Sequence, residues 1–369
     1  MYCTRTPTQQ HTQPHHTTQP HPTRCRWHRD EFPAGEEGHL GIPKTGPYAK
    51  FRVNPSQADF ELDPPRKPFR MYHGTGMPGF PQHPHRGFET FTILLDGTVD
   101  HTDSLGSSGR YSGGDAQWMC AGRGIVHGEM FPLVHTDRPN TLRLFQLWLN
   151  LPAASKGAEP CYTMQWGEKL TKVEGTGGAV ASVFAGRLGD AVATIPAPPA
   201  SWGAKPENDV GAFVIELPAG SSFVVPPAAG GAGVNRNVYL VEGAARGVTV
   251  GGRATGPAAI TVRPDVPVEL VNGASTEPAL VLVLQGKPIG EPVAQRGPFV
   301  ASSDAELASW FAEYRRTEFG GWPWADDAPY FPRDKGRFGS HKRGTAEEVP
   351  PSASSAAAAA SASAPTGEL

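Results

Sequence analysis

The chain has 369 residues, a formal net charge of −3 and many turn-forming residues, with 44 glycines and 38 prolines. The near-neutral charge and the lack of a basic run argue against direct binding to nucleic acid, and no apolar stretch approaches the roughly 20 residues that a membrane span needs. The four cysteines show no CxxC spacing, so we expect a reducing compartment rather than a disulfide framework, namely the cytoplasm, the nucleus or both.

Residues 1–35 are predicted to be a disordered tail. The first 29 residues are rich in Thr, Gln, Pro and His and contain no Asp or Glu, a composition that buries too little apolar area to fold. The lack of acid and the presence of four arginines also fit a transit peptide, so plastid targeting stays open, although the stretch shows no amphipathic pattern.

Two short histidine motifs dominate the next segment. His83-Pro84-His85 and His127-Gly128-Glu129 lie 44 residues apart. Because residues i and i+2 point to the same face of a strand, two such pairs on facing strands would place three imidazoles and one carboxylate around one point. That set suits a divalent transition metal such as iron, and less well copper, nickel, manganese or zinc.

Two other interpretations bear on these residues. A single histidine in a β-protein is more often a hydrogen-bonded polar group than a ligand, but two pairs at strand spacing are hard to obtain by accident. The carboxylate has two candidates, because alternation continued from His85 also puts Glu89 on the same face. Spacing alone leaves Glu89 and Glu129 both open.

The remaining pattern predicts short strands joined by tight turns. Residues 88–95 are apolar and β-branched, Asp96-Gly97 is a hairpin signal, and residues 141–151 alternate so that Leu144, Gln146 and Trp148 share a face. A second group of short strands follows between residues 180 and 290. This pattern is typical of double-sheet jelly rolls or barrels.

The second group of strands carries no histidine, because none occurs between His135 and His341. A second histidine-based metal site is therefore excluded there. After it, Ser303 to Glu306 form a capping box, and Leu307, Trp310, Phe311 and Tyr314 recur at helical spacing, which predicts one amphipathic helix.

These motifs resemble the pirin family of the cupin superfamily. The resemblance rests on residues 83–90 and 115–129, on 101–106 and 146–151, and on 291–300, and it runs from about residue 45 to 317. It implies an all-β bicupin, that is, two double-sheet jelly-roll β-barrels packed together, with a short C-terminal helix. It also implies that the metal ligands are His83, His85, His127 and Glu129, and so favours Glu129 over Glu89.

The resemblance sets the domain boundaries that we expect. After the tail come a metal-binding cupin domain (36–170), a cupin domain without metal (171–300), a helix with a wrapping segment (301–345) and a low-complexity tail (346–369).

Some pirin-like proteins resemble flavonol 2,4-dioxygenases, or quercetinases. The resemblance therefore implies one divalent metal per chain, Fe(2+) foremost, and a small aromatic substrate such as quercetin together with dioxygen. Glu129 would be both a ligand and the catalytic base. The alternative that it implies is a non-enzymatic, iron-dependent, redox-sensing transcriptional cofactor with protein partners. We expect a monomer that binds neither nucleic acid nor a membrane.

Overall fold

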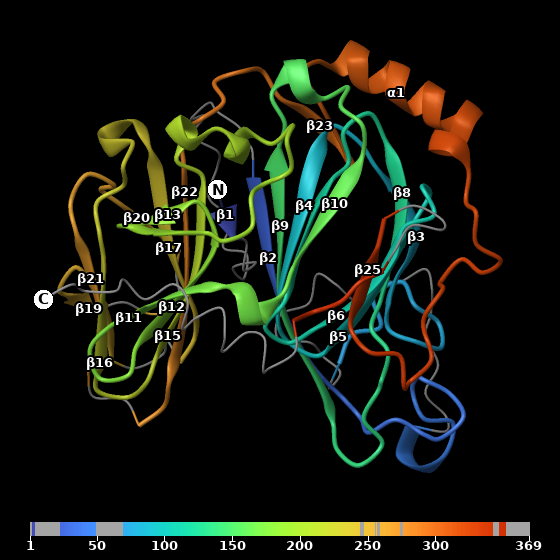
Figure 1. The fold of residues 1–369 in the computed structure, drawn as a ribbon, viewed down its shortest axis with the longest axis horizontal. Coiled ribbons are helices and arrows are strands. Elements are labelled where there is room, and N and C mark those ends of the chain that lie inside the picture. The colour runs from blue at the N-terminus through green and yellow to red at the C-terminus, as the bar shows by residue number, and fades with distance from the viewer. Residues whose placement is uncertain are drawn as a thin grey trace, which may run out of the picture.

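The computed structural model describes residues 2–3, 23–48, 69–243, 247–254, 256, 259–273, 276–341 and 347–351. They form two β-lobes that lie side by side, with one helix at an edge of the first lobe (Figure 1). No helix in this described part of the chain has the length and apolar character that crossing a membrane requires.

The first lobe consists of two facing sheets. The inner sheet, which faces the second lobe, has the order β1 (Tyr2–Cys3), β2 (Thr23–Phe32), β9 (Asn140–Asn150), β4 (Phe88–Asp96), β7 (Ala116–Cys120) and β10 (Cys161–Gln165). The outer sheet has the order β26 (Glu347–Glu348), β25 (Phe338–Ser340), β6 (Ser108–Ser112), β5 (Thr98–Asp103), β8 (Ile125–Met130) and β3 (Gly79–His85).

The second lobe repeats this architecture. One sheet has the order β11 (Thr171–Glu174), β12 (Val180–Ala185), β15 (Gly211–Leu217), β22 (Ala279–Gly286), β17 (Asn235–Glu242) and β20 (Ala259–Val262). The facing sheet has the order β16 (Ser221–Val225), β21 (Val268–Asn272), β18 (Val248–Val250) and β19 (Arg253–Ala254). The short pair β13 (Arg187–Leu188) and β14 (Ala191–Val192) lies between β12 and β15 in the chain.

Within the described residues, seven 3₁₀ turns interrupt the connections: Gly46–Tyr48, Ala153–Ser155, Gly167–Lys169, Trp202–Ala204, Pro206–Asn208, Gly231–Gly233 and Glu318–Gly320. The expected all-β class with paired double-sheet lobes is confirmed. Backbone hydrogen bonds among the described residues do not join the two sheets of either lobe into a closed barrel.

An apolar layer fixes the two lobes against each other. Strand alternation sends Leu142 and Leu144 of β9 into the first lobe, while Phe145 and Leu147 face the second lobe. The interlobe layer contains Phe91, Trp118, Phe145 and Leu147 of the first lobe and Phe184, Val214, Tyr239 and Leu282 of the second. Trp118 therefore lies between the lobes, stacked on Phe91 with ring centroids 4.4 Å apart.

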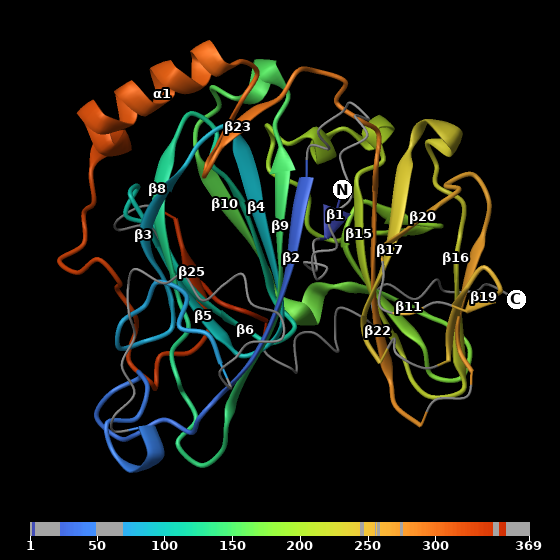
Figure 2. The same ribbon diagram turned by 180° about the vertical axis from the view of Figure 1, so that it is seen from behind.

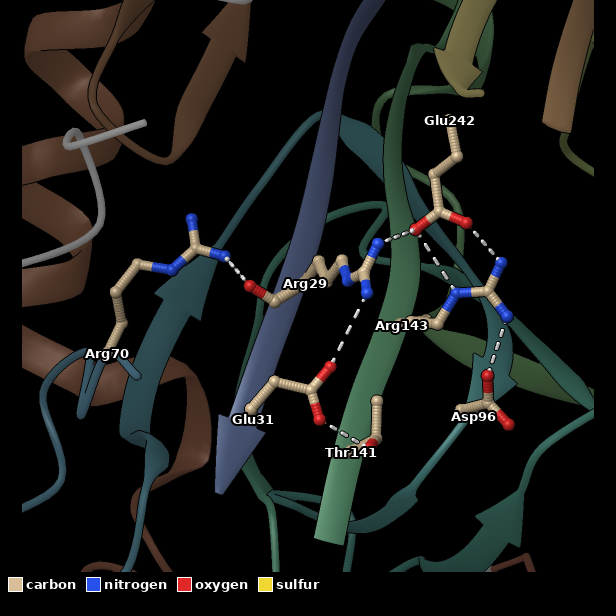
Figure 3. A network of polar contacts seen from close by, with 7 residues as sticks. All are labelled: Arg29, Glu31, Arg70, Asp96, Thr141, Arg143 and Glu242. Carbon is tan, nitrogen blue, oxygen red and sulfur yellow. Dashed lines mark hydrogen bonds and ion pairs between the residues drawn. The ribbon is translucent and has the colours of Figure 1, made fainter. Parts of the chain in front are cut away.

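Ion pairs extend this contact at the edge of the apolar layer (Figure 3). The Oε1 atom of Glu242 on β17 accepts from Arg29 Nη1 at 3.1 Å and from Arg143 Nε at 3.3 Å. Arg143 also donates from Nη1 to Asp96 at 2.7 Å. One carboxylate of the second lobe thus bridges β2 and β9 of the first lobe.

Strand β2 corrects the predicted N-terminal tail. Residues 23–32 pair antiparallel with residues 140–149 of β9, and the strand belongs to the sheet of the first lobe that faces the second lobe (Figure 2). The tail prediction for residues 1–35 is therefore wrong from residue 23 onward, where the sequence did not reveal a strand that carries Arg24, Arg26 and Arg29. Residues 4–22 lie outside the described residues.

The predicted helix is α1 (Asp304–Thr317). Ser303 caps it, because its side chain accepts from the backbone N–H of Glu306. Leu307 and Trp310 pack on Phe299 of the hairpin formed by β23 (Ala294–Arg296) and β24 (Phe299–Ala301). Beyond the helix, β25 pairs with β6 and β26 pairs with β25, so the chain is still ordered at residues 347–348, inside the predicted low-complexity tail.

Candidate metal centre and cavity

The outer sheet of the first lobe brings three histidines together. His83 and His85 lie on β3, and His127 is the direct cross-strand partner of His83 on β8. A register shift between Phe80 and His83 marks a bulge just before the first ligand motif. The candidate ligand nitrogens of the three rings all lie within 4.8 Å of one another. Among the described residues, this is the group of His, Cys, Asp or Glu side chains whose spacing could hold a metal ion.

The hydrogen bonds of these rings leave nitrogen lone pairs for a ligand. His83 Nδ1 donates to the carbonyl of Pro81 at 2.8 Å, so its Nε2 is unprotonated in the neutral ring. That Nε2 lies 3.1 Å from His85 Nε2, and neither ring nitrogen of the buried His127 has a hydrogen-bond partner. Such a cluster of buried nitrogens, poorly satisfied by the protein, fits a bound cation.

Burial keeps the three rings neutral. It lowers the pKa of His83 to about 4 and lowers the pKa values of His85 and His127 well below the usual value. Because a metal binds the neutral imidazole, the lowered pKa values favour the form that can bind. Imidazole donors suit iron, copper, nickel and zinc alike, so the donor set fits a divalent transition metal without selecting one.

Glu129 lines the same cavity but is not a member of the three-histidine group. Its Oε1 lies 3.2 Å from the Thr92 hydroxyl, and its Oε2 accepts from Gln146 Nε2 at 3.0 Å. Thr92 and Gln146 lie opposite each other on β4 and β9 of the inner sheet. The carboxylate therefore reaches from the outer sheet across the lobe. Burial raises its pKa, and the Coulombic effect of His101 opposes that rise.

Glu89, the other carboxylate candidate, points away from the histidines. Its Oε2 accepts from the Ser201 hydroxyl at 2.7 Å. The alternation that would have carried Glu89 to the side of His85 is broken at Gly87. There φ is +80° and an added Cβ would lie 2.2 Å from the Val300 carbonyl, so the chain turns from β3 of one sheet into β4 of the other.

The loop before His127 needs glycine for a related reason. Gly122 has φ +45°, and an added Cβ would lie 2.1 Å from the Ala158 carbonyl. The backbone bends at this glycine and passes close to the backbone of Ala158 rather than to the histidines.

A cavity of about 710 Å³ opens over the three-histidine group. Its wall is built from both sheets and from the segment before β24, and its lining is Arg26, His28, His73, Phe80, Pro81, Gln82, His83, His85, Glu129, Phe131, Leu144, Gln146, Trp148, Gly297 and Pro298. A mainly apolar lining with a few polar groups is typical of a site for a small organic ligand. The predicted shared face of Leu144, Gln146 and Trp148 forms one wall of it.

Sequence reasoning missed two parts of this site. Arg26 and His28 of β2 line the cavity, although their segment was predicted to be a tail. His101 of β5, whose ring centroid lies 5.5 Å from that of His127, is a buried neighbour of the three histidines. The one available signal for β2 was the alternation of buried Cys25 and partly buried Trp27 with arginines, which is typical of a half-buried strand.

Comparison with known proteins agrees with this geometry. Residues 51–149 match the Pirin family, and residues 212–320 match the Pirin C-terminal cupin domain. A Pseudomonas aeruginosa protein, provisionally named a quercetin 2,3-dioxygenase, is 36% identical over 252 residues, which are 64% of this chain and 79% of the relative. A pirin-like protein of Caulobacter vibrioides is 38% identical over 243 residues, covering 65% of this chain and 80% of the relative.

The solved structure of a quercetin 2,3-dioxygenase from Acinetobacter baumannii superposes with a TM-score of 0.57 at 30% identity, covering 66% of this chain and 80% of that one. Both lobes, the histidine cluster and these matches lead to one conclusion: the chain belongs to the pirin family of the cupin superfamily.

Proposed function

We propose that the chain is a metal-dependent dioxygenase that acts on a flavonol such as quercetin. The observation that carries the proposal is a cluster of three neutral histidines, two of which, His83 and His85, line a largely apolar cavity that also holds one carboxylate. The names of the Pseudomonas and Acinetobacter relatives support the same reaction class.

We assign the metal to His83, His85 and His127, with Glu129 as the fourth ligand and iron(II) as the ion. When bound there, the metal supplies a Lewis acid for a substrate hydroxyl oxygen and a site for dioxygen.

Glu129 is also the proton acceptor of the proposal. A general base must lie within hydrogen-bond reach of the proton that it takes, and Glu129 is the carboxylate that lines the cavity. It takes the proton of the flavonol 3-hydroxyl, and the Gln146 amide and the Thr92 hydroxyl bond this carboxylate. Removing such a base costs about 10²–10⁴ in rate.

The apolar wall positions the planar substrate. Phe80, Leu144, Trp148 and Pro298 line the cavity with apolar surface, and the rings of Phe80 and Trp148 can stack on an aromatic ring. They also exclude water, which strengthens the electrostatic interactions at the carboxylate.

The test is oxygen consumption by protein loaded anaerobically with iron(II) and then given quercetin in air. We expect substrate-dependent oxygen uptake that the metal-free protein lacks. Absence of uptake with quercetin and related flavonols, in protein that carries iron, contradicts the proposal and favours the redox-responsive cofactor instead.

A further inference from the structure

The proposed reaction leaves one buried, cavity-lining histidine without a role. His28 of β2 is 5% exposed, lines the cavity from the inner sheet, and is the cross-strand partner of Leu144, which lines it too. It belongs to the opposite sheet from the three-histidine group. A histidine on this wall can reach the part of a ligand that the metal centre does not hold.

A chain of buried hydrogen bonds orients His28. Its Nδ1 lies 3.0 Å from the Tyr72 hydroxyl, and that hydroxyl lies 2.6 Å from Asp30 Oδ2. Asp30 also accepts from Arg70 Nε at 3.0 Å, from Arg70 Nη2 at 2.8 Å and from the Arg70 backbone N–H at 2.7 Å. Arg70 Nη2 donates in addition to the carbonyl of Arg29, as Figure 3 shows.

The donors in this chain determine its direction. Burial raises the pKa of Asp30, but the bidentate contact with Arg70 favours the carboxylate, which can only accept. Tyr72 has one hydroxyl proton, and the short contact places it toward Asp30. The Tyr72 oxygen is then the acceptor for His28 Nδ1–H. Since burial lowers the pKa of His28 to about 3, the ring is neutral and its Nε2 keeps a lone pair.

The backbone at Tyr72 supports a role beyond packing. Tyr72 has φ +57°, a conformation that bulky side chains rarely adopt. Strained residues of this kind persist only where the surrounding structure holds them, and they gather at functional sites. In this backbone conformation, the Tyr72 hydroxyl lies between Asp30 and His28.

We propose that His28 Nε2 accepts a hydrogen bond from a hydroxyl group of the aromatic substrate, with its tautomer set by Arg70, Asp30 and Tyr72. The ligand class rests on the proposed function. His28 is then a substrate-binding residue that orients a polyhydroxylated ring on the wall opposite the metal ligands. A site built around a buried acceptor rejects an analogue that lacks the matching hydroxyl, because the acceptor is left unpaired.

The tautomer is tested without any substrate. Nitrogen NMR of the ¹⁵N-histidine-labelled protein, with the His28 signals assigned by their loss in His28→Gln, reports which ring nitrogen carries the proton. We expect a protonated Nδ1 and an unprotonated Nε2 across neutral pH, and a change in this pattern in Tyr72→Phe. A protonated Nε2 in the wild type overturns the proposal.

The substrate contact is tested by binding. Zinc-loaded protein is titrated with quercetin and with flavonols that each lack one hydroxyl, and the quenching of tryptophan fluorescence gives the Kd. We expect the loss of one particular hydroxyl to weaken binding about 10–100-fold in the wild type. That difference should fall to within about 2-fold in His28→Phe, which removes the acceptor. His28→Gln, which places an amide oxygen near the position of Nε2, should restore most of it, and melting curves check that both variants fold.

The outcomes separate the two proposals. Discrimination that persists unchanged in a folded His28→Phe protein overturns the role of His28 and leaves the proposed function standing. Failure of the wild type to bind any hydroxylated flavonol overturns the proposed function, and with it the assignment of His28 to such a substrate, even if the NMR shows the expected tautomer.

Discussion

His83 and His127 are cross-strand partners on β3 and β8, and their ring centroids lie 4.4 Å apart. Since His85 completes the group and the second lobe has no histidine, we predict one metal ion per chain. His127→Ala should lose the metal. His73→Ala removes an exposed histidine that lines the same cavity outside the group, and it should keep the metal. Elemental analysis of untagged protein measures both; two ions per chain would contradict the assignment.

Glu129 and Glu89 should respond differently to the same change. Glu129→Gln removes the proposed base and should lower the rate per bound iron about 10²–10⁴-fold. Glu89→Gln should leave the metal content and the rate nearly unchanged, because that side chain bonds Ser201 on the far face of the inner sheet. The assignment fails if Glu89→Gln loses the metal while Glu129→Gln keeps it.

The burial of Glu89 also predicts that the stability of the protein depends on pH. Burial raises its pKa from the ordinary value of 4.5 to about 8. The folded state therefore favours the protonated acid, and this contribution is present below pH 4.5 and is lost as the pH rises through about 8. Glu89→Gln cannot ionise. The free energy of unfolding of the wild type should fall relative to the variant over this range, on the order of several kcal/mol.

Urea unfolding of both proteins at a series of pH values measures that difference. Glu216→Gln, at an exposed position of β15, is the matched control and should show no such trend. A stability difference between wild type and Glu89→Gln that stays constant with pH would show that Glu89 is ionised in the folded protein.

The contacts of Glu242 predict that this residue stabilises the interface between the two lobes. Its carboxylate bonds Arg29 and Arg143 across the interface and is mostly buried. Glu242→Gln removes the counter-charge that Arg29 and Arg143 share, leaving Glu31 and Asp96 beside them. It should lower the free energy of unfolding by about 1–2 kcal/mol, between the values for exposed ion pairs and for buried charge-assisted hydrogen bonds. The loss should shrink in high salt, whereas a loss independent of salt would point to packing alone.

The sequence predicted those parts of the site that depend on local alternation. His83 and His85, and likewise His127 and Glu129, share a face because each pair lies at i and i+2 on one strand. The sequence alone also shows that the second lobe has no histidine. The helix cap at Ser303 could be predicted because the capping-box pattern lies within residues 303–306.

What the sequence could not predict depends on partners far along the chain. Strand β2 exists because β9 pairs with it, and the Thr- and Pro-rich residues before it hid its alternation. Deleting residues 1–29, which belong to the predicted tail, would remove most of this strand and His28 with it. Trp118 faces the second lobe rather than the cavity, and only the packed structure shows which side of the inner sheet the second lobe covers.

We propose that the protein oxidises a flavonol at the metal centre in its cavity. The most direct measurement is the carbon monoxide released by iron-loaded protein when it consumes a limiting amount of quercetin in air. We predict about one carbon monoxide for each flavonol and each dioxygen consumed, and none from His127→Ala prepared in the same way. Disappearance of quercetin without carbon monoxide, or an equal yield from His127→Ala, would contradict the account.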